Sequence, residues 1–186
     1  MDSHQIINST KERMNKAIKV SSEELSGVRT GRATTTILDR ITVDYYGTKT
    51  PLRQLSSINV PEKQTITIQP WDKNSIPAIE KAIMESDLGL TPGNDGNIIR
   101  LSIPPLTEER RKELVKIVHH IAEEGRVAIR NIRRDANEHL KREQKEGKIS
   151  EDDYYRNHDQ IQKFTDEHIE NLDDMMKNKE QEVMEV

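Results

Sequence analysis

The sequence predicts an α+β fold in which an elongated three-helix bundle carries a small inserted β/α/β domain. Apolar residues recur at helical spacing in three long segments, one before residue 30 and two after residue 105. Between them, short segments alternate apolar and polar residues, which is typical of strands. Aromatic residues make up 3% and charged residues 33% of the 186 residues, a composition that favours helix-rich proteins.

The first helix is expected over about residues 3–29. Apolar and small side chains recur there on one face, at Ile7, Met14, Ala17, Ile18, Ser21, Leu25 and Val28. The second helix is expected to begin after Thr107, whose hydroxyl can accept a hydrogen bond from the first turn, and to end near Gly147. Its expected core face consists of Leu114, Ile117, Val118, Ile121, Gly125, Ala128, Ile132, Ala136 and Leu140.

The third helix is expected to begin at Ser150, because Asp153 stands three residues later in the position of a capping box. It continues through Ile161, Ile169 and Leu172 toward Val183. None of the three helices is apolar all round, so each needs partners to cover its apolar face. A three-helix bundle is the simplest arrangement that provides them.

The middle region is expected to form the inserted domain. Ile41, Val43 and Tyr45 alternate with polar residues and predict its first strand. The sequence then predicts a turn at residues 46–49, strands at 57–60 and 65–68, a helix at about 75–86, a loop at 92–96 and a final strand at 98–103.

These elements place residues 1–30 and 105–186 in the bundle and residues 31–104 in the inserted domain. An insertion requires two chain crossings, and two short crossings side by side favour a joint at which the domains rotate. Glycine at the first crossing permits backbone conformations that other residues avoid, and the two prolines at the second crossing restrict how the chain can bend. The expected hinge residues are Thr30, Gly31, Arg32, Ala33, Pro104 and Pro105. A fixed interface with ordinary linkers is the alternative.

The second helix carries the most informative pattern of side chains. At about 100° per residue, Arg126, Arg130 and Arg133 fall in one narrow stripe with Asn137, and Arg134 lies just beside it. Gly125, Ala128, Ile132 and Ala136 are expected on roughly the opposite side, against the core. Because a guanidinium can form two parallel hydrogen bonds with a phosphate, this stripe predicts docking on a structured polyanion. The alternative is a solvated face with salt bridges to Glu123 or Glu138.

The charge distribution supports a directional surface. The chain has a formal net charge of −4, yet residues 110–134 carry a net charge of +5 and residues 150–186 a net charge of −8. Arg110, Arg111 and Lys112 open the second helix against its dipole, which also suggests a partner. Arg29 and Arg32 flank the expected hinge and either extend the basic patch or tie the two domains together.

Several kinds of chemistry find no support in the sequence. The chain has no cysteine, no apolar run near residues 1–19 that resembles a secretory signal and no span for a membrane, so a soluble cytoplasmic protein is expected. His119 and His120 point about 100° apart on a helix and cannot bind one metal ion together. Trp71 and Phe164 are too isolated to stack bases and are expected in the core or on the domain surface. We therefore expect no catalytic residues, metal or cofactor, and no enzyme.

The chain resembles the ribosome recycling factors over its whole length. The resemblance rests on six segments in order, which are Val28–Ala33, Val43–Gly47, Pro51–Leu55, Glu80–Ile83, Pro105–Lys112 and Arg130–Asn137. One departure is Thr34–Thr35, where the family commonly has Ser-Pro; this difference could alter the stiffness of the hinge.

The resemblance implies an L-shaped monomer of roughly transfer-RNA dimensions that binds ribosomal RNA of the large subunit. It also implies a partner, elongation factor G, whose GTP hydrolysis helps to split the post-termination ribosome into subunits. By the same resemblance Arg133 is the principal RNA-contacting arginine, Arg130 and Arg29 are further basic positions, and Gly31 lies at the elbow. Two other classes remain open on the residues alone: a helical scaffold or chaperone, and a metalloenzyme that uses His119 and His120.

Overall fold

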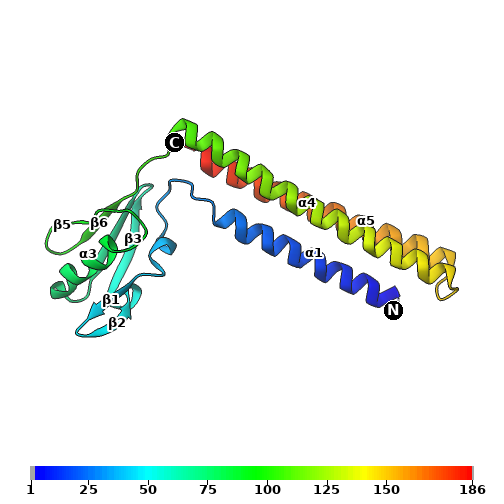
Figure 1. The fold of residues 1–186 in the computed structure, drawn as a ribbon, viewed down its shortest axis with the longest axis horizontal. Helices are drawn as coiled ribbons and strands as arrows, with labels where there is room; N and C mark the ends of the chain where they lie inside the picture. Colours follow the sequence, from blue (N-terminus) through cyan, green and yellow to red (C-terminus); the bar gives the residue numbers. More distant parts are fainter. Residues whose placement is uncertain (1–2, 186) are drawn as a thin grey trace. The chain divides into compact units, whose positions relative to one another are not determined.

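The computed structural model describes residues 3–185 and divides into two compact units (Figure 1). The helical unit comprises the residues up to Thr30 together with those from Thr107 onward. The sheet unit comprises Gly31–Leu106. Among residues 3–185, no helix combines the length and the apolar character that crossing a membrane requires.

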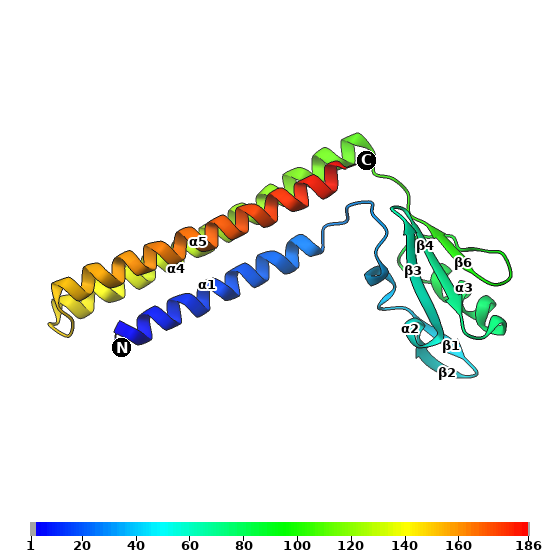
Figure 2. The same cartoon turned by 180° about the vertical axis from the view of Figure 1, so that it is seen from behind.

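The helical unit is a bundle of three helices, as the sequence predicts. These are α1 (Ser3–Ser26), α4 (Glu108–Lys145) and α5 (Glu151–Met184). Figures 1 and 2 show α4 and α5 lying side by side as a long hairpin, with α1 running along them. At 1.5 Å per residue, α4 is about 57 Å long and α5 about 51 Å long.

The ends of the two long helices follow the predicted capping signals. The Thr107 hydroxyl accepts a hydrogen bond from the backbone N–H of Arg110 at 3.2 Å. Gly147 takes a φ of +69° just after α4, in the left-handed region that favours glycine. The Ser150 hydroxyl accepts from the backbone N–H of Asp153 at 3.0 Å and donates to its carboxylate at 2.8 Å. The predicted limits of these helices are therefore confirmed.

The three helices approach one another closely at Gly125. A Cβ built at Gly125 would lie 2.6 Å from the Ser21 hydroxyl oxygen and 2.8 Å from a Leu172 methyl carbon. Three predicted details of this face are wrong. Ala122 and Ile129, which the predicted face omits, are fully buried, and Ile117, which it includes, is 42% exposed.

The sheet unit contains two antiparallel sheets. β1 (Thr42–Tyr45) and β2 (Thr48–Pro51) form a hairpin. The second sheet has the order β3-β4-β6-β5, and its strands are β3 (Ser56–Glu62), β4 (Thr65–Pro70), β5 (Gly93–Asn94) and β6 (Ile99–Ser102). The short helices are η1 (Thr35–Leu38), α2 (Leu52–Leu55), η2 (Lys73–Ser75) and α3 (Ile76–Met84).

The core of the sheet unit lies between the four-stranded sheet and α3. Ile66 and Ile68 of β4 alternate with polar residues and are fully buried, as are Ile99 and Leu101 of β6. The β/α/β character predicted for this region is confirmed. Two predicted boundaries differ: the turn is confined to residues 46–47, because Thr48 and Lys49 pair with β1, and the loop at 92–96 contains β5.

The two ends of the sheet unit are fastened to the same turn. The backbone N–H of Ala33 donates to the carbonyl of Lys63 at 2.8 Å, and that of Ile103 donates to the carbonyl of Gln64 at 2.7 Å. Gly31 has a φ of +73°, and a Cβ built on it would lie 3.0 Å from the Leu106 side chain. The incoming and outgoing chain segments therefore lie together at the turn between β3 and β4.

Candidate nucleic-acid interface

The orientation of α4 decides which basic side chains can reach a ligand. Its buried face consists of Leu114, Val118, Ala122, Gly125, Ile129, Ile132, Ala136, Leu140 and Glu143. At about 100° per residue, the middle of this face lies roughly 80° from Arg126 rather than opposite to it. The expectation that the arginine stripe lies opposite the core is therefore wrong. The stripe borders α5, because α4 packs against two helices and its buried sector is wide.

Arg126 belongs to the interior of the bundle. Its side chain is only 18% exposed, and its guanidinium binds the Asp173 carboxylate of α5 at 2.6 Å and that of Glu123 at 2.9 Å. Burial alone would lower the pKa of Arg126, but the hydrogen bonds to Asp173 and Glu123 outweigh it and raise that pKa. The prediction that Arg126 turns a free guanidinium outward is wrong, because its donors are already engaged by α5 and by its own helix.

Arg130 is more accessible than Arg126. Its side chain is 47% exposed and forms a long ion pair of 3.4 Å with Glu123. The hydrogen bond from Arg126, together with the charges of both arginines, lowers the pKa of Glu123. Exposed ion pairs of this kind contribute little stability, so Arg130 can exchange Glu123 for another anion at small cost.

Arg133 and Arg134 are the members of the group with the weakest internal contacts. Arg133 is half-buried beside α5 and donates to the side-chain oxygen of Gln162 at 3.5 Å, the limit of a hydrogen bond. Arg134 is exposed and has no ion-pair partner within residues 3–185. Both guanidiniums retain donors for a phosphate.

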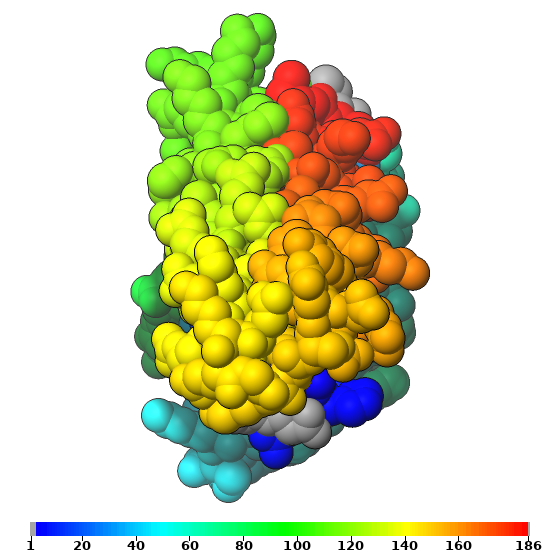
Figure 3. Space-filling model, turned by 90° about the vertical axis from the view of Figure 1, so that its right-hand side faces the viewer, coloured from blue at the N-terminus to red at the C-terminus, as the bar shows by residue number. Residues whose placement is uncertain are grey.

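The exposed side of α4 carries more basic residues than the stripe alone. We call this set the basic ridge; it consists of Lys112, Lys116, Arg130, Arg134, Lys141 and Lys145, all exposed. These six positions fall within a sector of about 60° on the helix and extend along about 50 Å. Glu109 and Glu123 are the acids in the same sector. Figure 3 shows α4 exposed along its length beside α5.

Sequence reasoning missed Lys116, Lys141 and Lys145. The signal was available, because the same 100° rotation that aligns the arginines also aligns these lysines. It was hidden because these three lysines stand singly along the sequence, outside the dense basic clusters at residues 110–112 and 126–134.

The basic cluster at the start of α4 is largely engaged by its own helix. Arg110 pairs with Glu113 at 2.7 Å, and Lys112 pairs with Glu108 at 2.9 Å. Arg111 is half-buried, and its Nε atom is buried without a hydrogen-bond partner among the described residues. These contacts explain how the cluster is tolerated near the positive end of the helix dipole. The RNA-binding role of the cluster stays a prediction.

The remaining predicted residues lie near the connections between the units. Arg29 follows α1 and is exposed in the helical unit, whereas Arg32 is half-buried in the sheet unit. Ala33 is buried and hydrogen-bonded within the sheet unit, so any rotation is expected outside it. Pro104 and Pro105 are exposed and belong to no helix or strand.

The two histidines singled out in the sequence contact different carboxylates. His119 lies 3.0 Å from Glu180 of α5, and His120 lies 3.2 Å from Glu124 of α4. Within residues 3–185, no group of three or more histidine and carboxylate side chains is arranged to hold a metal ion.

Comparisons with known proteins agree with this architecture. The family described as ribosome recycling factor matches residues 21–184. A ribosome-recycling factor of Geobacillus sp. (strain WCH70) is 56% identical over 182 residues, which are 98% of each chain. The ribosome-recycling factor of Bacillus subtilis (strain 168) is 55% identical over 184 residues, which are 99% of this chain and 100% of that one.

Two solved structures are similar over the whole chain. A solution structure of a ribosome recycling factor is 47% identical, covers 100% of this chain and 99% of its own, and has a TM-score of 0.76. The T. thermophilus ribosome recycling factor, described together with E. coli elongation factor G on the E. coli post-termination complex, is also 47% identical. It covers 100% of both chains with a TM-score of 0.63.

Proposed function

The chain belongs to the ribosome recycling factor family, and we propose that it recycles ribosomes after translation termination. In this proposal it binds ribosomal RNA of the large subunit and acts with elongation factor G. GTP hydrolysis by that partner supplies the free energy that separates the two subunits. The observation that carries the proposal is the basic ridge, which an otherwise acidic chain presents along one exposed side of α4.

The basic ridge suits folded RNA because it presents a row of cations that can contact phosphates without reading individual bases. Recognition of folded RNA depends mainly on shape and on contacts to phosphate and sugar. Arg130 and Arg134 supply exposed guanidiniums at the middle of the ridge, and Arg133 lies at its border with α5. A rigid helix holds these groups at fixed spacing, which lowers the entropy lost on binding.

In this proposal the two units have different tasks. The helical unit anchors the protein to RNA, and the sheet unit moves when the partner GTPase displaces it. The incoming and outgoing segments are fastened together at the turn between β3 and β4, which allows both to transmit a displacement to the bundle. The chain itself contributes binding and force transmission rather than chemical catalysis.

Arginine substitutions on α4 test the RNA-binding surface. Arg133→Ala and Arg134→Ala should each weaken binding to isolated large subunits and reduce the slope of log affinity against log salt by roughly 0.7–0.9, the effect of one phosphate contact. The measurement is co-sedimentation with large subunits over a series of salt concentrations.

Arg126→Ala is the matched control, since it removes the same charge from the same helix. We expect it to leave the salt slope unchanged and to lower the melting temperature of the bundle, because it leaves Asp173 without its partner. A flattened slope for Arg126→Ala combined with unchanged slopes for the other two variants would contradict the assignment.

A further inference from the structure

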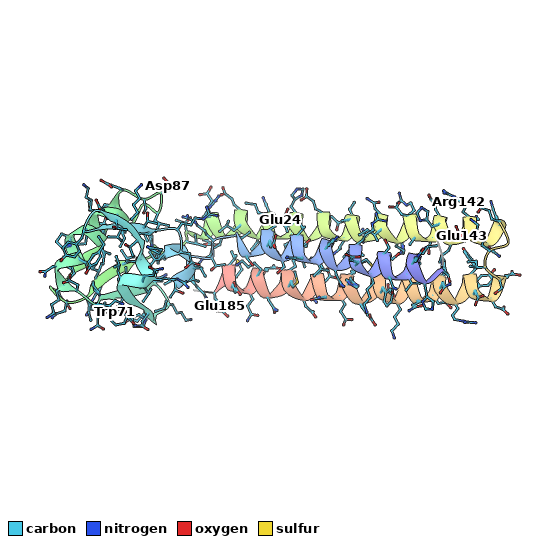
Figure 4. All side chains as sticks on the ribbon, turned by 90° about the horizontal axis from the view of Figure 1, so that it is seen from below. Glu24, Trp71, Asp87, Arg142, Glu143 and Glu185 are labelled. Atoms are coloured by element: carbon cyan, nitrogen blue, oxygen red, sulfur yellow. The ribbon has the colours of Figure 1, made fainter. Side chains whose placement is uncertain are left out.

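Glu123 interrupts the basic ridge near its middle. Lys116 and Arg130 each stand seven residues from it, which is about 10 Å along the helix axis. Figure 4 shows α4 along one edge of the helical unit, with side chains that project away from the other two helices along its whole length. Glu109, the other acid of this sector, lies in the first turn, where the helix dipole favours an acid. No dipole effect accounts for Glu123 in the interior of the helix.

Contacts within the bundle hold the Glu123 carboxylate in place. Its Oε2 atom accepts a hydrogen bond from Arg126 at 2.9 Å, and its Oε1 atom accepts one from Arg130 at 3.4 Å. Arg126 is in turn fixed by Asp173 of α5, to which its Nε atom donates at 2.8 Å. When Arg130 turns to a phosphate, Glu123 therefore stays with Arg126 and presents Oε1 to the ligand.

The stability of the fold does not explain Glu123 at this position. Asp173 binds two nitrogen atoms of the Arg126 guanidinium, at 2.8 and 2.6 Å, and so neutralises the arginine that is largely buried. The Glu123 side chain is 54% exposed, and ion pairs of exposed groups contribute little to stability. The main effect of Glu123 is therefore expected on the binding of a ligand.

The carboxylate distinguishes between the groups that a polyanion can present to it. The hydrogen bond from Arg126 lowers the pKa of Glu123, so the group is ionised at neutral pH. An ionised carboxylate only accepts hydrogen bonds. It repels phosphate but binds the 2′-hydroxyl of a ribose or the amino group of a base. Contacts of this kind provide selectivity, whereas phosphate contacts set the position of the protein.

We infer that Glu123 is a specificity-determining residue of the basic ridge, which accepts a hydrogen bond from a hydroxyl or amino group of folded RNA and excludes a continuous row of phosphates. The inference rests on the proposed function, because the RNA is that of the large subunit. It adds to the phosphate contacts of the ridge one contact that a simple polyanion does not provide.

Glu123→Ala separates this role from simple charge repulsion. If only net charge mattered, removing an acid from a phosphate-binding surface would strengthen binding to every polyanion. We expect opposite changes instead. Affinity for isolated large subunits should fall at least about fivefold, because a hydrogen bond to a charged group is lost. Affinity for long-chain inorganic polyphosphate, which has neither ribose nor base, should rise at least about threefold, because like charges no longer meet.

Glu124→Ala is the matched control. It removes the same charge one residue further along α4 and about 100° around the helix, where Glu124 lies 3.2 Å from His120. Both affinities should stay within about twofold of those of the unaltered chain, because salt screens a charge outside the contact surface. Co-sedimentation measures binding to large subunits, and fluorescence anisotropy of labelled polyphosphate measures the other affinity in the same buffer.

Glu123→Gln provides a second test that does not depend on the loss of the side chain. Glutamine keeps an oxygen that accepts from Arg126 and loses only the charge, so the melting temperature should match that of the unaltered chain. Polyphosphate should again bind more tightly, while large subunits should bind no more tightly than they do to the unaltered chain.

A change in the same direction for both ligands, or no change for either, overturns the inference. The proposed function then still stands, provided that the unaltered chain co-sediments with large subunits. An unaltered chain that does not co-sediment contradicts the proposed function, and the inference fails with it.

Discussion

Lengthening both connections between the two units is expected to abolish ribosome splitting while preserving ribosome binding. The variant carries Gly-Ser-Gly-Ser between Thr30 and Gly31 and again between Leu106 and Thr107. In the proposed mechanism the sheet unit transmits a displacement through these two segments alone. Four flexible residues span about 10–12 Å on average, so they absorb a displacement of that size instead of transmitting it.

The insertion points leave the local structure intact. The packing of Gly31 against Leu106 stays within the sheet unit, and Thr107 still caps α4. Affinity for the large subunit should therefore remain within about threefold of the unaltered chain. The splitting rate with elongation factor G and GTP should fall at least about tenfold, a loss of more than about 1.4 kcal/mol of coupling.

Each single insertion is the matched control, since one connection then keeps its original length. Single insertions should retain most of the splitting activity. Normal splitting by the double insertion would show that the connections do not carry the displacement, and would contradict the proposed transmission of force from the sheet unit to the bundle.

Gly125→Ala is expected to produce the largest loss of stability from a single methyl group. The added Cβ would overlap both the Ser21 hydroxyl and a Leu172 methyl group, from the two other helices of the bundle. Overpacking of this kind costs about 1–3 kcal/mol. This overpacking cost should exceed the gain of roughly 1 kcal/mol that alanine, as a better helix former than glycine, would otherwise bring. Denaturation followed by far-ultraviolet circular dichroism measures the difference.

A second-site change identifies the cause of that loss. Ser21→Ala removes the atom that lies closest to the new Cβ, so Gly125→Ala combined with Ser21→Ala should be more stable than the sum of the single effects predicts. Additive effects would indicate that the clash with Ser21 is not responsible. A Gly125→Ala chain more stable than the original would contradict the close approach of the three helices.

The limits of the long helices could be predicted because capping is a local property. Thr107, Gly147 and Ser150 act through their own backbone and their immediate neighbours, and each is found as predicted. The change in hydrophobic period likewise predicts two units, but it places Pro105 and Leu106 in the bundle, whereas the structure groups them with the sheet unit. The hairpin strand β2 was missed because Thr48 and Lys49 are polar and exposed, so no alternation marks them.

The direction of the arginine stripe could not be predicted from one helix alone. Periodicity reports which residues share a face, but the position of the core depends on which helices cover that face. Because α5 covers the flank of α4, Arg126 is drawn inward to Asp173 while Arg134 stays exposed.

The most direct measurement of the central claim is ribosome splitting by the purified chain, followed by light scattering of post-termination ribosomes. We expect separation into subunits only when the chain, elongation factor G and GTP are all present, and none with a GTP analogue that cannot be hydrolysed. Scattering that falls no faster with the chain than with elongation factor G and GTP alone would contradict this expectation.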